Sequence, residues 1–167
     1  FLVEQGAHQP LIQCANAQSS SRELKVSAFR ALFQICYSNE GASVTVTEEA
    51  SFLRCLTDAV QPSADEDVQL KALECVSIIV SSAPSTQPQY FGLLPEIVSL
   101  LRSSSTSSSA KKQIVLLFKS LSVEEDSRAA CEEAGAVAPL LDIVRTDSTS
   151  ESAAFAALAI ANLVGDK

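Results

Sequence analysis

Apolar residues recur along the chain in four similar blocks. The blocks are Ala28–Cys36, Ala72–Val80, Ile114–Ser122 and Ala156–Val164. Each repeats apolar residues at i, i+4 and i+7, as a helix does when one stripe faces a core. One column of equivalent positions, spaced by 44, 42 and 42 residues, consists of Leu32, Val76, Phe118 and Ile160. A second column with the same spacing consists of Ile35, Ile79, Leu121 and Leu163. A repeat of this length predicts an all-α stack of two- or three-helix units, a solenoid.

A shorter apolar segment precedes each block and predicts a second helix in every unit. These segments are Gln9–Ala17, Phe52–Val60, Leu94–Arg102 and Val137–Arg145. Three of them carry proline in the first turn, where the missing N–H costs nothing, at Pro10, Pro95 and Pro139. Glycines stand three or four residues earlier, where the chain must bend sharply, at Gly6, Gly92 and Gly135.

A third, still shorter helix is expected before each glycine, and it is clearest at Glu124–Ala134. Ser122 and Glu125 are predicted to open it as a capping pair. In the third unit Pro84 and Pro88 fall in the same place, so the first helix there should be short or broken.

Serines mark the expected starts of the long helices. The pattern Ser-x-x-Glu, typical of a capping box at a helix N-terminus, begins at Ser20, Ser63 and Ser148. The third unit has a serine-rich run over residues 103–109 instead, which we interpret as an elongated loop.

The last unit carries Glu133-Ala-Gly-Ala-x-x-Pro-Leu-Leu141 and ends in Ala159-x-x-Asn-Leu163, and these motifs resemble the armadillo-repeat family. The resemblance implies a right-handed superhelix in which the third helices line a concave groove for extended peptides or partner proteins. We expect one solenoid domain over residues 1–167, with repeats at about 1–38, 39–82, 83–122 and 123–164. A HEAT-type solenoid with two helices per unit is the architectural alternative.

The resemblance also assigns positions that face a ligand. In the family, asparagines on the third helices grip a peptide backbone, and tryptophans four residues earlier hold lysine side chains. Here Asn162 alone matches the asparagine ladder, and its equivalents are Gln34, Ile78 and Ser120. The tryptophan positions hold Arg30, Glu74, Leu116 and Leu158, and the chain has no tryptophan. These eight residues are the predicted partner-binding set.

Composition narrows the kind of partner. The net charge is −8, and such a surface repels phosphate backbones, so no nucleic-acid partner is expected. No run of about 18 apolar residues is present, so no membrane span is expected. Five cysteines without a CxxC pair fit buried, reduced thiols in the cytoplasm, with the nucleus or cilium as alternatives.

Residues that could support chemistry are few. His8 is the only histidine and has no cysteine or Ser/Asp partner at a useful spacing, so a surface or packing role is expected. Lys111, Lys112 and Lys119 form a local basic patch, interpreted as a solvated helix face. No nucleotide-binding or hydrolase motif occurs. We therefore expect no catalytic residue, no metal site and no cofactor.

The sequence predicts a non-catalytic protein–protein interaction scaffold that uses the groove of the third helices. The alternatives are a structural subunit docked in a large ciliary or organellar assembly, and the docking or regulatory arm of an enzyme encoded elsewhere in a longer chain. Because Phe1 begins without a cap and residues 165–167 follow directly after the last predicted helix, we expect neighbouring repeats or subunits to cover the ends.

Overall fold

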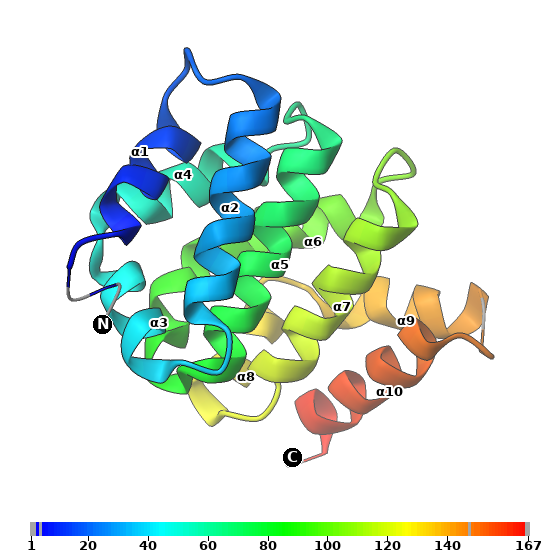
Figure 1. Ribbon diagram of the computed structural model, residues 1–167. Coiled ribbons are helices and arrows are strands. Elements are labelled where there is room, and N and C mark those ends of the chain that lie inside the picture. Colours follow the sequence, from blue (N-terminus) through cyan, green and yellow to red (C-terminus); the bar gives the residue numbers. More distant parts are fainter. Residues whose placement is uncertain (1–2, 4, 147, 166–167) are drawn as a thin grey trace. The chain divides into compact units, whose positions relative to one another are not determined.

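The computed structural model describes residue 3, residues 5–146 and residues 148–165, and these residues form helices joined by short turns (Figure 1). No strand occurs in this part of the chain, so the prediction of an all-α fold is confirmed. The chain divides into two compact units, Phe1–Thr86 and Gln87–Lys167. A single solenoid domain over residues 1–167 stays a prediction, and Phe1 and Lys167 lie outside the described residues.

The first unit contains a helix pair followed by a helix triplet. Its helices are α1 (His8–Asn16), α2 (Arg22–Cys36), α3 (Glu40–Glu48), α4 (Ala50–Ala59) and α5 (Glu66–Ser82). The long helix α2 packs against α1 and against α5, which Figure 1 shows side by side with it. Helices α3 and α4 contact each other and α5, and α1 contacts α4. The second repeat therefore has three helices, as an armadillo-type unit requires.

The second unit repeats this arrangement. A 3-10 segment, η1 (Pro84–Leu93), crosses from the first unit into the second and replaces the first α-helix of the third repeat. Pro88 lies inside η1 and has no N–H to donate, so the predicted interruption by proline is confirmed. The following helices are α6 (Leu94–Arg102), α7 (Ser108–Leu121), α8 (Glu125–Glu133), α9 (Val137–Thr146) and α10 (Glu151–Val164). Helix α10 packs against α7, α8 and α9.

Most positions of the two apolar columns lie in the core, although Ile35 of the second column is only half-buried. Leu32, Val76 and Phe118 have no exposed surface. Ile160 differs, because it is only half-buried. Its helix contacts α7 on one side, and no later helix covers it among the described residues. The four residues of this column therefore occupy equivalent positions, but the side chain of the last one, Ile160, is only partly covered by neighbouring helices.

The long helices begin at residues other than those predicted. Their N-cap side chains accept a hydrogen bond from the N–H three residues later, at 3.1–3.3 Å, and belong to Ser21, Asp65, Ser107 and Ser150. The predicted boxes at Ser20, Ser63 and Ser148 are wrong by one or two residues. The four real caps are spaced by 44, 42 and 43 residues, so the third unit follows the common register. Ser107 in its serine-rich run caps α7, and Ser108 and Ser109 already belong to that helix, so the loop is shorter than the predicted residues 103–109.

Two of the predicted glycine bends are confirmed. Gly6 and Gly135 have φ of 73° and 76°, in the left-handed region that glycine enters without strain. At the end of α8 the N–H of Gly135 bonds to Glu132 O and that of Ala136 to Cys131 O, the pair of bonds that defines a Schellman motif. Gly92 instead lies within η1.

Candidate partner-binding surface

In the first unit, the predicted positions lie on the two long helices that pack together. Arg30 and Gln34 on α2 are exposed, and Glu74 and Ile78 on α5 are half-buried. Leu32, between the first two, points into the core. The four residues thus occupy the outward stripe of adjacent helices, and this stripe is mainly polar.

Glu74 is already engaged in an ion pair. Lys71 Nζ lies 2.7 Å from Glu74 Oε2, one turn away on α5. The side chains keep 30% and 25% of their exposure, so water screens the pair only partly. Lys71 and Glu74 together carry no net charge, and Arg30 adds a positive charge to the outward stripe of the first unit.

In the second unit the equivalent stripe is more apolar. Leu116 and Ser120 on α7 are half-buried, and Leu158 on α10 is 46% exposed. Beside them the Lys119 ammonium lies 4.6 Å from the centre of the Phe155 ring, a cation–π contact between the same two helices. An exposed leucine among half-buried residues offers apolar contact area to a partner.

Asn162, the one match to the asparagine ladder, makes a bond within the chain. Its Nδ2 donates to the hydroxyl of Ser122 at 3.1 Å, and Ser122 in turn donates to Lys119 O at 2.8 Å. Ser122 was predicted to cap the next helix, but α8 is preceded by Glu124, which makes no side-chain cap bond. The Oδ1 atom of Asn162 has no hydrogen bond within the described part of the chain.

His8 has the packing role expected of it. It is 3% exposed, and its Nε2 lies 3.3 Å from Glu49 Oε1, which also accepts from Gln9 Nε2 at 3.1 Å. These two hydrogen bonds, first that from Gln9, lower the pKa of Glu49. The contacts tie the start of α1 to the junction between α3 and α4.

The cysteines are unpaired thiols. Burial raises the pKa of Cys36 to about 11 and those of Cys55 and Cys131 to about 12, and it raises that of Cys75 strongly. Such thiols are poor nucleophiles and poor metal ligands. Cys14 is half-buried, which differs from the prediction. In the residues that the structure describes, no three His, Cys, Asp or Glu side chains are placed to hold a metal ion.

The predicted basic patch separates into three environments. Lys112 forms an ion pair with Glu151 at 2.6 Å, and Lys119 covers Phe155. Lys111 lines a pocket among α6, α7, α9 and α10, with a volume of about 580 Å³.

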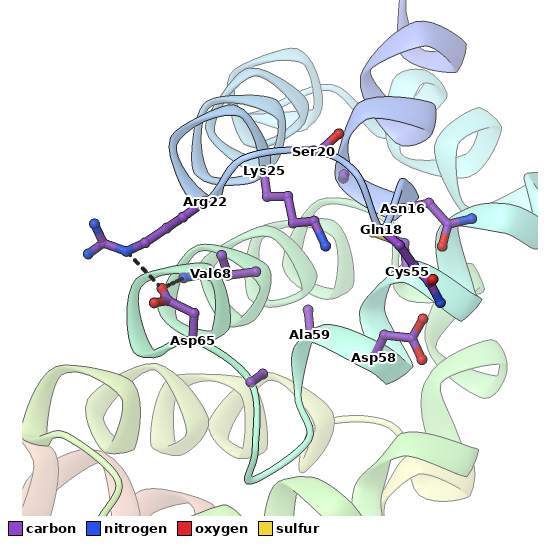
Figure 2. Close-up of a pocket in the computed structure, with 12 residues that line it drawn as sticks. Asn16, Gln18, Ser20, Arg22, Lys25, Cys55, Asp58, Ala59, Asp65 and Val68 are labelled. Atoms are coloured by element: carbon purple, nitrogen blue, oxygen red, sulfur yellow. Dashed lines mark hydrogen bonds and ion pairs between the residues drawn. The ribbon is translucent and has the colours of Figure 1, made fainter.

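A second pocket of about 400 Å³ lies among α1, α2, α4 and α5 and contains Lys25 (Figure 2). Neither pocket was predicted from the sequence, although a lysine and an aspartate recur in their linings at the spacing of the repeat.

Comparisons with known proteins support the fold. No family model and no curated protein matches the sequence. A designed armadillo repeat protein in complex with the peptide (KR)4 matches with a TM-score of 0.84 and 27% identity, over 96% of this chain and 66% of that one. Computationally designed armadillo repeat proteins for modular peptide recognition match with a TM-score of 0.84 and 25% identity, over 96% and 66%. The chain has an armadillo-like repeat fold.

This armadillo-like chain spans slightly less than two thirds of the length of the first designed proteins it matches. Another designed armadillo repeat protein, at 24% identity and a TM-score of 0.84, agrees on the fold. Together with the three-helix second and fourth repeats, these likenesses favour the armadillo over the HEAT arrangement. Among the described residues, no helix has the length and apolar character needed to cross a bilayer.

Proposed function

We propose that this chain is a non-catalytic scaffold that binds a partner protein or extended peptide along the outward stripe of its third helices. The observation that carries the proposal is the exposure of all eight predicted positions, fully or in part, on helices whose neighbouring positions are buried. A similar fold holds a peptide in the designed protein that was solved with (KR)4.

The chemistry of the stripe favours a mixed peptide over a purely basic one. Arg30 and Gln34 offer a cation and an amide in the first unit, whereas Leu116 and Leu158 offer apolar contact in the second. The chain lacks tryptophan, which would hold lysine side chains, and Glu74 is paired with Lys71. Acidic or polar partner residues complement the first-unit stripe, and apolar partner residues complement the second-unit stripe.

The remaining features fit a protein partner in a reducing compartment. The net charge of −8 disfavours a nucleic acid, and the five free thiols favour the cytoplasm. Localisation of a tagged chain by microscopy checks the compartment.

A random library of displayed peptides tests the stripe directly. Peptides selected on the wild-type chain should lose at least tenfold in affinity on the triple variant Arg30→Ala, Gln34→Ala, Leu158→Ala, because a few buried contacts carry most of the binding energy. Binding is measured by fluorescence anisotropy.

A matched control removes similar side chains from exposed positions outside the stripe, in the variant Arg54→Ala, Gln13→Ala, Leu24→Ala. It should bind the same peptides as the wild type. If the stripe variant binds as well as the wild type, the partner docks on another surface, and the structural-subunit alternative replaces the proposal.

A further inference from the structure

Two pockets recur at equivalent places in the two units. The first-unit pocket lies at the ends of α1 and α4 and the starts of α2 and α5 (Figure 2). The second-unit pocket lies at the corresponding ends of α6 and α9 and starts of α7 and α10. Each is an open hollow within its own unit, between two successive second helices and the third helices that follow them.

One lysine and one aspartate in each pocket lining are related by the repeat. The other charged lining residues, Arg22 and Asp65 in the first pocket and Arg102 in the second, have no charged equivalent in the other pocket. Lys25 and Lys111 are 86 positions apart, the same interval that separates the buried Leu32 and Phe118. Asp58 and Asp142 are 84 positions apart, the same interval that separates Val76 and Ile160. Each pocket therefore has a lysine from a third helix and an aspartate from the next second helix.

The fold itself does not require these residues. At the intervening equivalent positions the chain has Gln69 and Leu100, and both are buried. A lysine and an aspartate at both pockets, and at neither intervening position, indicate a feature that is specific to the pockets.

In the first-unit pocket the two charges face the hollow without neutralising each other. Figure 2 shows Lys25 extending from α2 toward α4, and Asp58, an exposed residue of α4, lines the same pocket. Within the described residues neither side chain has an ion-pair partner, whereas the nearby Arg22 is paired with Asp65 at 3.1 Å. Burial raises the pKa of the Cys55 thiol in the pocket wall, the Asp58 carboxylate raises it further, and the Lys25 ammonium opposes the rise. Both charges thus act on the same part of the pocket.

The second-unit pocket has the same polarity and a larger apolar floor. Lys111 has no ion-pair partner in the described part of the chain, and Asp142 is 3.7 Å from the exposed Arg145. The floor contains Leu101, Val115, Pro139 and Ile143, whereas the first pocket has three alanines, Cys55 and Val68. The cation therefore lies beside a surface that suits an apolar group.

We propose that each pocket binds the carboxyl-terminal residue of a partner peptide. Such a residue carries a carboxylate, an N–H and a side chain on one carbon, and it matches a lysine, an aspartate and an apolar floor within one small cavity. Pockets of roughly 300–1,000 Å³ suit ligands of this size. The lysine pairs with the carboxylate, the aspartate accepts from the N–H, and the floor contacts an apolar side chain.

This binding mode does not depend on the outward stripe of the third helices. None of the eight predicted partner-binding residues lines either pocket. Failure of the peptide-stripe proposal would therefore leave this proposal standing, and the reverse also holds.

The probes are N-acetylated tripeptides Gly-Gly-X with a free carboxylate, one for each natural amino acid X, together with the same peptides amidated at the C-terminus. Binding to the whole chain is followed by nuclear magnetic resonance titration, which reports the two pockets separately. Free-acid peptides that end in an apolar residue should bind. Amidation should lower their affinity by about tenfold or more, because the charge-assisted contact between the lysine and the carboxylate is lost. The smaller first-unit pocket should prefer smaller terminal residues.

Single variants assign the effect to each pocket. Lys25→Met should weaken binding about tenfold at the first-unit pocket only, and Lys111→Met at the second only. Lys25→Arg and Lys111→Arg keep the charge and should retain most of the affinity. The controls Arg54→Met on α4 and Lys112→Met on α7 remove a charge outside the pocket linings and should change nothing.

Three results would overturn the proposal. The first is equal affinity for the free-acid and the amidated peptides. The second is the absence of resonance shifts around Lys25 or Lys111 with any peptide at millimolar concentration, and the third is unchanged affinity in both methionine variants. Binding of peptides with an internal acidic residue and an amidated end would assign the pockets to side-chain carboxylates instead.

Discussion

Asn162 and Ser122 form a hydrogen bond of 3.1 Å that joins α10 to the end of α7. The bond uses the amide nitrogen of the only ladder asparagine, and Ser122 lies buried beneath it. A residue that the family resemblance assigns to a ligand therefore also links two successive third helices. Its carbonyl oxygen and the second N–H of its amide are the groups left for a peptide.

Removing either partner of this bond should destabilise the chain, and the two losses should not add. Asn162→Ala and Ser122→Ala should each lower the free energy of unfolding by about 1 kcal/mol, and the double variant should cost about 1 kcal/mol less than the sum. Urea denaturation monitored by circular dichroism measures all three. Additive losses would show that the bond contributes nothing in solution.

The N-cap of α2 gives a sharp test of the helix start. Ser21→Ala should lower the free energy of unfolding by about 1 kcal/mol, because the Leu24 N–H loses its acceptor. Ser20→Ala is the matched control, since no side-chain bond of Ser20 caps the helix, and it should change stability by less than about 0.5 kcal/mol. Thermal or urea unfolding compares the two. The reverse order of effects would restore the capping box that begins at Ser20.

Apolar spacing predicted the core, because a periodic stripe reports directly which side of a helix is buried. Leu32, Val76 and Phe118 are fully buried as their shared interval implied. The helix starts were harder, since several serines stand near each one and only backbone geometry decides which hydroxyl reaches an amide. Ser20 and Ser21 are adjacent and both have an acidic residue nearby. The Ser-x-x-Glu pattern therefore predicts Ser20 as the N-cap, whereas Ser21 caps the helix.

Contacts between residues that are far apart in the sequence could not be predicted from it. Nothing in the sequence indicates that Asn162 donates to Ser122, 40 residues away, because the bond depends on the packing of α10 on α7. The pockets are a different case. Lys25 and Lys111 share the interval of the core column, so comparing charged residues in the same register would have found them.

The core column should show a gradient of sensitivity that follows burial. Phe118→Ala removes a fully buried ring and should lower the free energy of unfolding by about 3–5 kcal/mol. Ile160→Ala should cost less than about 2 kcal/mol, because its side chain is only half-buried and leaves a smaller cavity. Urea denaturation at one pH measures both. Equal losses would mean that further structure covers α10 in solution.

The buried thiol of Cys131 should make stability fall at alkaline pH. Burial raises its pKa in the folded chain to about 12, whereas an unfolded cysteine titrates near about 8.5. Between these values the folded state holds one more proton than the unfolded state, so its contribution is complete below about pH 8.5 and declines as pH rises. The slope approaches about 1.4 kcal/mol per pH unit for this one group.

Comparing the wild type with Cys131→Ala separates this thiol from the lysines and tyrosines that titrate in the same range. Cys131→Ala lowers stability at pH 7 through lost packing, yet its stability should decline less steeply than that of the wild type above pH 9. The difference in free energy of unfolding between the two, measured with urea at each pH, should therefore shrink as pH rises. A constant difference would mean that Cys131 titrates alike in both states, and hence that water reaches its sulfur in the folded chain.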